Sequence, residues 1–364
     1  MKYFAPGRVN LIGDHTDYNG GMVFPAALTM GTYLTITEDV PAHVCKFTSE
    51  NDTHEYLIEE ADLQQRHHAW VDYPLGVLKE FTDRGFRVTG WHFHFAGNLP
   101  IGAALSSSAS IEVATAVALN DLNGNPFSQL ELVQMAQHAE NAFVEVNCGI
   151  MDQFASGFGK QNHAIALDCQ SLNYEWVPLQ MDGLKFVITN TNKKRGLVDS
   201  AYNQRRTECQ QAFDTLRREC DAPALCLYTQ EQFDAMAHLL SGDVLKRARH
   251  AVSEHNRVVR AITALQQGNM PLFGQLMSES HHSLRDDYEV TCPELDFIAA
   301  FAQRFPGVLG SRMTGAGFGG CTVTLIAENQ VADFVRQLTE TYENQFNIHP
   351  DCYVADVGDG AKRI

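Results

Sequence analysis

The chain has 364 residues, 45% of them hydrophobic and 20% charged, and a formal net charge of -17 at pH 7. This apolar content excludes a wholly disordered chain, and no run approaches the ~20 consecutive apolar residues that a membrane helix needs. A surface this negative repels phosphate backbones and anionic lipid, so nucleic acids and membranes are poor partners. We therefore expect a globular protein that binds a small molecule and holds any phosphate locally, through backbone N–H groups, a metal ion or a few cations.

Nine cysteines are scattered through the chain without a CxxC pair. This pattern favours reduced thiols over a disulfide scaffold or a structural zinc site. His92 and His94 share one face of a predicted strand but have no third partner at ligand spacing, so we interpret them as ordinary strand residues. The first residues lack the apolar core of a signal peptide, and we expect a cytoplasmic protein.

The order of apolar residues predicts elements along the chain. Strands are expected over residues 22–36 and over residues 91–95, where apolar and polar side chains alternate in the second. Residues 128–131 form a capping box that starts a helix, and apolar residues follow it at helical spacing as far as Phe143. A second amphipathic helix is expected over residues 331–342.

The fold class follows from how these elements alternate. Strands and helices succeed one another without the tight rhythm of βαβ units, which indicates an α+β protein. A chain of this length favours two packed domains of roughly 100–200 residues each. Residues 168–171 have the composition of a turn that leaves a strand, so we predict domains over residues 1–170 and 171–364.

The first of three glycine-bearing polar segments spans residues 6–21. It carries Asp14, His15 and Asp17 on one loop and closes with two glycines. Carboxylates and an imidazole in this arrangement suit hydrogen bonding to several hydroxyls of a sugar or polyol. A solvated turn with local side-chain bonds is the alternative interpretation.

The second segment, residues 98–110, is rich in small residues and serines and leads into an apolar helix. Backbone N–H groups, serine hydroxyls and the positive end of that helix favour phosphate binding, although a serine-capped buried helix has the same pattern.

In the third segment, residues 312–321, the glycines satisfy GxGxxG. A strand, and not a helix, is predicted next, so we interpret this segment as a tight turn that lets backbone approach a ligand or another loop.

These three segments, in this order and spacing, resemble the motifs of the GHMP small-molecule kinases. Residues 7–19 are similar to the signature of the galactokinase branch of that family. Further matching runs are residues 148–153, 246–258 and 285–296, so the resemblance extends over nearly the whole chain. No Walker A motif and no protein-kinase HRD or DFG motif is present.

The resemblance implies a two-domain GHMP kinase fold with the active site in the cleft between the domains. The N-terminal domain is expected to be ribosomal-protein-S5-like and the C-terminal domain ferredoxin-like. The resemblance also allows the C-terminal tail to return to the first domain. It implies transfer of the ATP γ-phosphoryl group to the anomeric C1 hydroxyl of galactose, a reaction that depends mostly on positioning and charge stabilisation.

The resemblance also assigns roles to residues. Asp152 matches the catalytic base, and Arg8 matches the cation that keeps this carboxylate ionised. Mg²⁺ is expected on Ser108 and Glu140. The residues that match sugar contacts are Asp14, His15, Asp17, Gly149, Asp152 and Tyr202. Those that match the phosphate loop for ATP are Gly102, Ala103, Ala104, Leu105, Ser106, Ser107 and Ser108.

Two positions depart from the family pattern. Asp14 stands where the family normally has glutamate, which allows a related acceptor such as N-acetylgalactosamine or arabinose. Ala104 stands where the family usually has glycine, and its methyl group would crowd a loop that needs a glycine-only conformation. A non-catalytic galactose sensor is a remote alternative. Such proteins have a damaged serine loop, whereas the serine loop of this chain is intact. We expect a monomer or a weak homo-oligomer.

Overall fold

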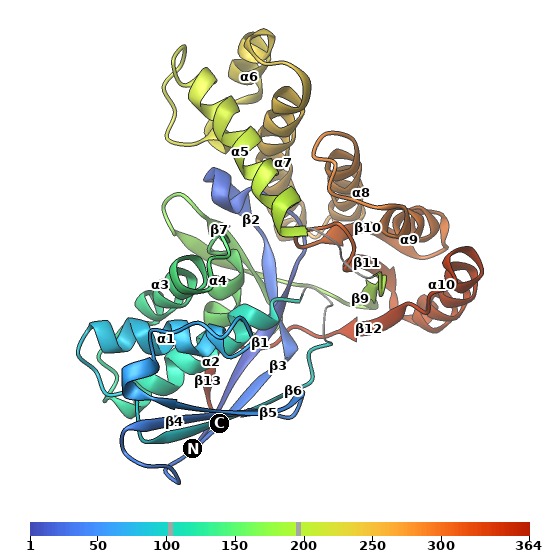
Figure 1. The fold of residues 1–364 in the computed structure, drawn as a ribbon. Coiled ribbons are helices and arrows are strands. Elements are labelled where there is room, and N and C mark those ends of the chain that lie inside the picture. The colour runs from blue at the N-terminus through green and yellow to red at the C-terminus, as the bar shows by residue number, and fades with distance from the viewer. Residues whose placement is uncertain (101–104, 194–197) are drawn as a thin grey trace.

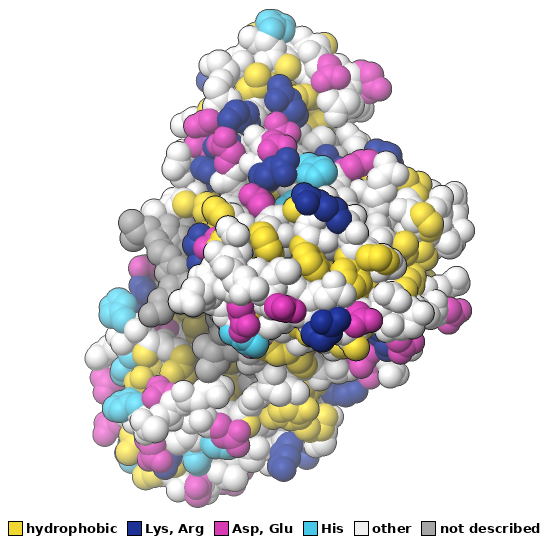
Figure 2. Space-filling view, turned by 90° about the vertical axis from the view of Figure 1, so that its right-hand side faces the viewer, with side chains coloured by type: hydrophobic (Ala, Val, Ile, Leu, Met, Phe, Trp, Pro, Cys, Tyr) yellow, Lys and Arg dark blue, Asp and Glu magenta, His cyan; other side chains and the backbone are white. Residues whose placement is uncertain are grey.

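The computed structural model describes residues 1–100, 105–193 and 198–364. Its strands form three sheets, and helices cover one face of the largest sheet and pack on both faces of a second one (Figure 1). Among the described residues, no helix has the length and apolar character to cross a membrane. On the face in Figure 2, acidic and basic side chains are interspersed, so the negative net charge is not gathered there into one patch.

The largest sheet has six strands in the order β13-β1-β3-β6-β4-β5. Its strands are β1 (Lys2–Asn10), β3 (Pro25–Thr37), β4 (Val44–Ser49), β5 (Asp52–Glu59), β6 (Trp91–Gly97) and β13 (Lys362–Arg363). The last two-residue strand pairs with β1, so the two ends of the chain lie together at one edge (Figure 1). β6 confirms the strand predicted over residues 91–95, on which His92 and His94 both hydrogen-bond to Thr48.

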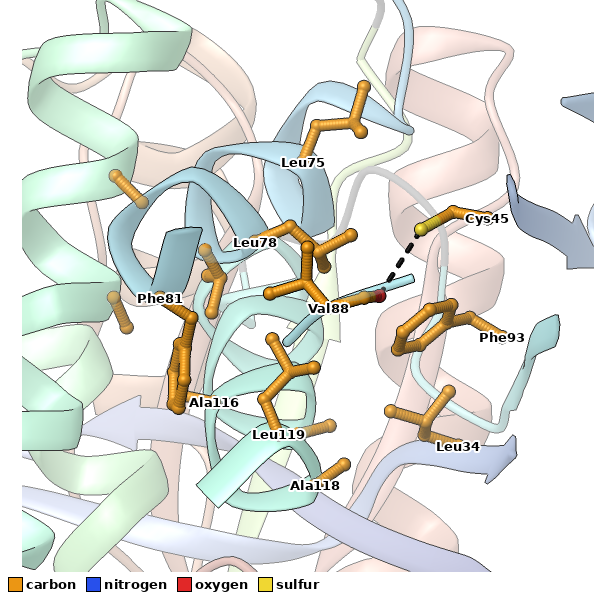
Figure 3. Packing of buried hydrophobic residues seen from close by; sticks show 14 of the residues in the cluster. Leu34, Cys45, Leu75, Leu78, Phe81, Val88, Phe93, Ala116, Ala118 and Leu119 are labelled. Atoms are coloured by element: carbon orange, nitrogen blue, oxygen red, sulfur yellow. Dashed lines mark hydrogen bonds between the residues drawn. The ribbon is translucent and has the colours of Figure 1, made fainter. Parts of the chain in front are cut away.

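Four helices accompany this sheet. They are α1 (Asp72–Asp83), α2 (Ser107–Leu122), α3 (Gln129–Ala139) and α4 (Met151–Phe158). Leu34, Phe93 and Cys45 of the sheet meet Leu78 of α1 and Leu119 of α2 in a closely packed apolar core (Figure 3). The predicted capping box is confirmed at the start of α3. The predicted continuation to Phe143 takes a different form, because a short π-helical segment, η3 (Glu140–Val144), replaces the α-helix.

A three-stranded sheet adjoins this unit in the order β2-β7-β8, with β2 (Met22–Val23), β7 (His163–Asp168) and β8 (Tyr174–Pro178). The strand predicted over residues 22–36 is confirmed from residue 25 onwards, but the chain breaks at Phe24, so that β2 and β3 are separate strands. Phe24 exchanges backbone hydrogen bonds with Leu11 and Ile12, and the following Pro25 has no N–H to donate. The chain therefore passes from one sheet to another at this point.

The second large sheet has four strands in the order β10-β11-β9-β12. They are β9 (Leu184–Asn190), β10 (Val308–Thr314), β11 (Cys321–Ala327) and β12 (Asp351–Ala355). One face of it packs on α9 (Pro293–Arg304) and α10 (Val331–Phe346). The other face shares a core with β1, β3, α7 (Gly242–Gln266) and α8 (Met270–Asp286). α10 confirms the second predicted helix.

The remaining helices, α5 (Val198–Leu216) and α6 (Gln230–Met236), pack with α7 in a separate cluster. The predicted turn at residues 168–171 is confirmed, and Asp168 accepts hydrogen bonds from the backbone N–H groups of Gln170 and Ser171. This turn joins β7 to β8, which pair with each other, so a division at residue 170 passes through a hairpin. The division of the chain into residues 1–170 and 171–364 stays a prediction.

Candidate active site

A cavity of about 270 Å³ lies where the loop after β1, the start of α2, the start of α4 and the loop after β10 meet. Segments that are far apart in the sequence all contribute to its wall. The predicted site residues that line it are Arg8, Asp14, His15, Asp17, Ser108, Glu140, Gly149, Asp152 and Tyr202. The fold therefore gathers the predicted catalytic, sugar-binding and metal-binding side chains around one space.

The predicted phosphate loop is divided between several places. Gly102, Ala103 and Ala104 lie outside the described residues. Of the remaining residues, only Ser108 lines this cavity, while Leu105 is buried. Ser106 and Ser107 take separate places: Ser106 contacts Asp152, and Ser107 lines a neighbouring cavity.

Asp152 is held by two partners at the wall of the cavity. The Arg8 guanidinium donates from Nε to Oδ1 at 2.9 Å and from Nη2 to Oδ2 at 3.0 Å. The Ser106 hydroxyl donates to Oδ2 at 2.6 Å. Asp152 also lies in the first turn of α4, where the helix dipole favours a negative charge. This bidentate grip fixes the carboxylate and leaves little rotational freedom for it.

A glycine explains how Arg8 reaches this position. A Cβ on Gly7 would lie 2.5 Å from the Leu105 carbonyl oxygen, so β1 passes the serine loop at backbone contact distance. The Arg8 N–H then donates to the Leu105 carbonyl at 3.2 Å. This backbone hydrogen bond joins the strand that carries Arg8 to the middle of the predicted phosphate loop.

Asp14 is almost completely buried and accepts three hydrogen bonds. Arg312 of β10 donates to its Oδ2 at 2.5 Å, and Asn10 and the Gly315 N–H donate to its Oδ1 at 2.9 and 3.2 Å. Burial raises the pKa of this carboxyl, and the positive charge of Arg312 opposes that change. Because Arg312 is itself fully buried, each charge depends on the other.

Asp17 also lines the cavity, and burial strongly perturbs its carboxyl. Burial, followed by the negative charge of Asp152, raises its pKa from 3.8 to about 6. A Cβ on Gly149 would lie 1.9 Å from its Oδ2 atom. Glycine at position 149 therefore makes room for this carboxylate.

His15 lies in an aromatic environment with a left-handed backbone, at φ 65°. Its ring centroid is 4.7 Å from that of Tyr288 and 5.7 Å from that of Tyr202. Burial lowers the pKa of His15 to about 3, so the imidazole is neutral at physiological pH. A neutral imidazole offers one donor and one acceptor to a ligand.

Glu140 stands on η3 and belongs to a buried carboxylate cluster. The amide of Gln153 donates both to Glu140 Oε2 at 2.6 Å and to Glu112 Oε2 at 3.0 Å. Burial and the charge of Asp152 raise the pKa of Glu140.

Ser108 lines the cavity beside Glu140. Among the described residues no group of three or more His, Cys, Asp and Glu side chains could hold a metal ion. The hydroxyl and carboxylate present nevertheless fit Mg²⁺, which takes hard oxygen ligands and commonly completes its shell with water and phosphate.

A second cavity of about 290 Å³ lies beside the start of α2. Its wall is mainly apolar and includes Trp70, Phe95, Leu99 and Ile111, together with Ser107. The size and the indole in the wall suit a flat aromatic group. Apart from Ser107, sequence analysis named none of its lining residues as a site residue, because they come from five separate stretches that carry no shared motif.

The third glycine segment forms a tight turn, as predicted, and β11 follows it. Gly315 contacts Asp14, and a Cβ on Gly317 would lie 2.2 Å from the Val290 carbonyl oxygen. Sequence analysis did not assign Arg312, although it stands in this segment. No sequence pattern identified Arg312, because its burial depends on packing between segments that are far apart in the chain.

Comparisons with known proteins agree with this geometry. Family models match at residues 1–38 (galactokinase galactose-binding signature), 72–160 (GHMP kinases N-terminal domain) and 261–344 (GHMP kinases C-terminal). The chain is 49% identical to a galactokinase of Bacillus subtilis over 100% of its own length and 94% of that protein. It is 46% identical to one of Clostridium beijerinckii, with the same coverage.

Solved structures give the same result. A crystal structure of Lactococcus lactis galactokinase complexed with galactose matches with a TM-score of 0.96 and 41% identity, over 100% of this chain and 95% of that one. A mevalonate kinase matches with a TM-score of 0.70 at 17% identity over 98% and 99%, which shows the shared fold alone. The expected GHMP kinase fold is confirmed, and the chain belongs to the galactokinase family of the GHMP kinases.

Proposed function

We propose that this chain transfers the γ-phosphoryl group of ATP to the C1 hydroxyl of galactose, giving galactose 1-phosphate and ADP. The observation that carries the proposal is the Asp152 carboxylate, gripped by Arg8 at the wall of a cavity that Asp14 and Asp17 also line. The relatives named galactokinase, one of them complexed with galactose, support the same acceptor.

Asp152 would act as the base. As the C1 oxygen attacks the γ-phosphorus, its proton moves to Asp152 and the bond from that phosphorus to the bridging oxygen breaks, releasing ADP. A positioned base of this kind contributes ~10²–10⁴-fold to the rate. Arg8 would keep Asp152 ionised and would stabilise negative charge that develops on the transferred group.

The triphosphate would lie at the start of α2. Residues 102–108 are proposed to surround it, with Ser106, Ser107 and Ser108 adding hydroxyl donors at the positive end of a 16-residue helix. The adenine base would occupy the cavity lined by Trp70, which shares Ser107 with this loop. Ser108 and Glu140 would hold Mg²⁺, which would neutralise phosphate charge during transfer.

A related sugar is the second candidate acceptor. Asp14 has a shorter side chain than the glutamate usual in the family, and its carboxylate is engaged by Arg312, Asn10 and Gly315. Because its side chain is one methylene shorter than that of glutamate, the Asp14 carboxylate reaches less far into the cavity that it lines. N-acetylgalactosamine and arabinose are therefore the competing substrates to examine.

The deciding experiment measures ADP release by the purified chain with ATP and Mg²⁺ over a panel of galactose, N-acetylgalactosamine, arabinose and glucose. We expect the highest kcat/KM for galactose and a product phosphorylated at C1. A kcat/KM for galactose near the bottom of the panel would exclude galactose as the substrate. Tight binding of ATP and galactose with no turnover would support a sensor instead.

A further inference from the structure

A line of hydrogen-bonding side chains runs from the active-site cavity into the protein interior. The Nδ1 atom of His15 lies 2.8 Å from the Tyr18 hydroxyl, and the Tyr18 hydroxyl lies 2.8 Å from the Tyr288 hydroxyl. The Tyr288 hydroxyl lies 3.2 Å from Cys209 Sγ. His15 and Tyr18 come from the loop after β1, Cys209 from α5 and Tyr288 from the segment after α8, so the line joins three distant parts of the chain. The proposed roles of the cavity residues do not use this line.

The His15 ring is held firmly where it meets this line. Its left-handed backbone conformation costs a residue other than glycine about 1 kcal/mol, so surrounding contacts must stabilise it. The Asn19 amide donates to the His15 carbonyl at 2.8 Å, and the Tyr288 ring packs against the imidazole. The ring is therefore fixed in place, and the position of its proton is the property left to determine.

Elementary acid–base chemistry sets the direction of the hydrogen bonds. A phenol is a good donor and a neutral imidazole nitrogen is a good acceptor, whereas a thiol is weak in both roles. These preferences favour Tyr18 as the donor to His15 Nδ1, Tyr288 as the donor to Tyr18, and the Cys209 thiol as the donor to Tyr288. Because the imidazole is neutral and Nδ1 accepts, its single proton resides on Nε2.

The other ring nitrogen of His15, Nε2, has no such hydrogen-bond partner within the described part of the chain. His15 Nε2 is buried and makes no hydrogen bond to any residue that the structure describes. The backbone of Ala316, which also lines the cavity, acts to raise the pKa of His15, but it provides no atom at hydrogen-bond distance from Nε2. A buried N–H without an acceptor is costly, so a ligand oxygen in the cavity would complete it.

The remaining lining explains why such a donor is useful. Asp14, Asp17 and Asp152 offer carboxylates, which accept hydrogen bonds from sugar hydroxyls and donate none when ionised, so a further donor in the cavity is useful. We infer that Tyr18 and Tyr288 are positioning residues that hold His15 as an Nε2–H donor, so that His15 recognises a sugar oxygen as a hydrogen-bond acceptor. The identity of that ligand rests on the proposed function, while the position of the proton does not.

The position of the proton can be measured without turnover. In protein labelled with ¹⁵N-histidine, long-range ¹H–¹⁵N correlation spectra distinguish a protonated ring nitrogen from an unprotonated one, and loss of a signal in His15→Gln assigns His15. We expect the Nε2–H form in the wild type and a mixture of both forms in Tyr18→Phe. A wild-type ring protonated at Nδ1 would overturn the inference, even if every variant failed to fold.

The consequence for the ligand is tested by kinetics with a matched control. Tyr342 is another fully buried tyrosine, and its hydroxyl donates to the Thr191 carbonyl at 2.8 Å, away from the cavity. We expect Tyr18→Phe to raise the galactose KM about tenfold with an unchanged KM for ATP, and Tyr342→Phe to lower stability without changing either KM. Equal KM values in the two variants would refute the positioning role. An Nε2–H ring in a protein that turns over no galactose would instead refute the proposed function alone.

Discussion

Replacement of Asp17 by asparagine should stabilise the empty protein and abolish its affinity for sugar. The pKa of Asp17 is raised from 3.8 to about 6, chiefly by burial and then by the charge of Asp152. The folded chain therefore holds a proton between roughly pH 4 and pH 6 that the unfolded chain has already released. Above this window the carboxylate is ionised in both states, and the fold bears the full cost of keeping the charge.

The magnitude follows from the same values. Each pH unit of difference in pKa corresponds to about 1.4 kcal/mol, so the cost is about 3 kcal/mol at most. Asp17 lines a cavity that water can enter, and this screening reduces the expected gain to about 1–2 kcal/mol. Asparagine keeps an oxygen for the Tyr18 backbone N–H and removes the repulsion with Asp152.

The assay is urea unfolding of the wild type and Asp17→Asn from pH 4 to pH 8. The difference in free energy of unfolding should be near zero at pH 4, rise through the window and level off above pH 6. Asp214→Asn on the exposed surface of α5 is the control, and its difference should stay small at every pH. A stabilisation by Asp17→Asn that is the same at pH 4 and pH 8 would refute the reasoning. A galactose KM close to the wild-type value would refute the sugar-binding role.

Three further predictions concern the proposed reaction. Asp152→Asn should lower kcat by ~10² or more while galactose binding, measured by calorimetry, stays largely intact; retained turnover would remove Asp152 from the role of base. Gly149→Ala should raise the galactose KM at least tenfold with little loss of thermal stability. The new Cβ would displace the Asp17 side chain but no backbone atom. An unchanged KM would count against this steric explanation. Ser108→Ala should raise the Mg²⁺ concentration needed for half-maximal activity, and an unchanged titration would argue against a metal role for Ser108.

Local signals in the sequence predicted the elements that depend on local interactions. The capping box before α3 and the apolar stripe of α10 are formed by residues three or four positions apart, so a short window contains the whole pattern. The break at Phe24 was missed because it depends on hydrogen bonds to Leu11 and Ile12, which no periodicity records. Likewise, the π-helical segment after α3 has no distinct composition.

The candidate site shows the same division between local and distant causes. Its carboxylates were named from motifs, but the partner that neutralises Asp14 comes from Arg312, almost three hundred residues later. Which acid a buried arginine meets depends on how the sheets pack, so the pair could not be read from spacing. The cavity at Trp70 is a similar case, since only the folded chain brings its walls together.

The pairing of Arg312 with Asp14 also affects how parts of this protein would behave alone. The guanidinium contacts the Asn10 carbonyl at the end of β1 and Asp14 in the loop that follows, yet Arg312 belongs to the four-stranded sheet. A fragment that ends near residue 170 would retain the loop with Asp14 but would bury that acid without its cation. Binding of sugar by a mixture of two separately produced fragments would therefore show that the fragments had associated. Neither fragment would be expected to bind sugar alone.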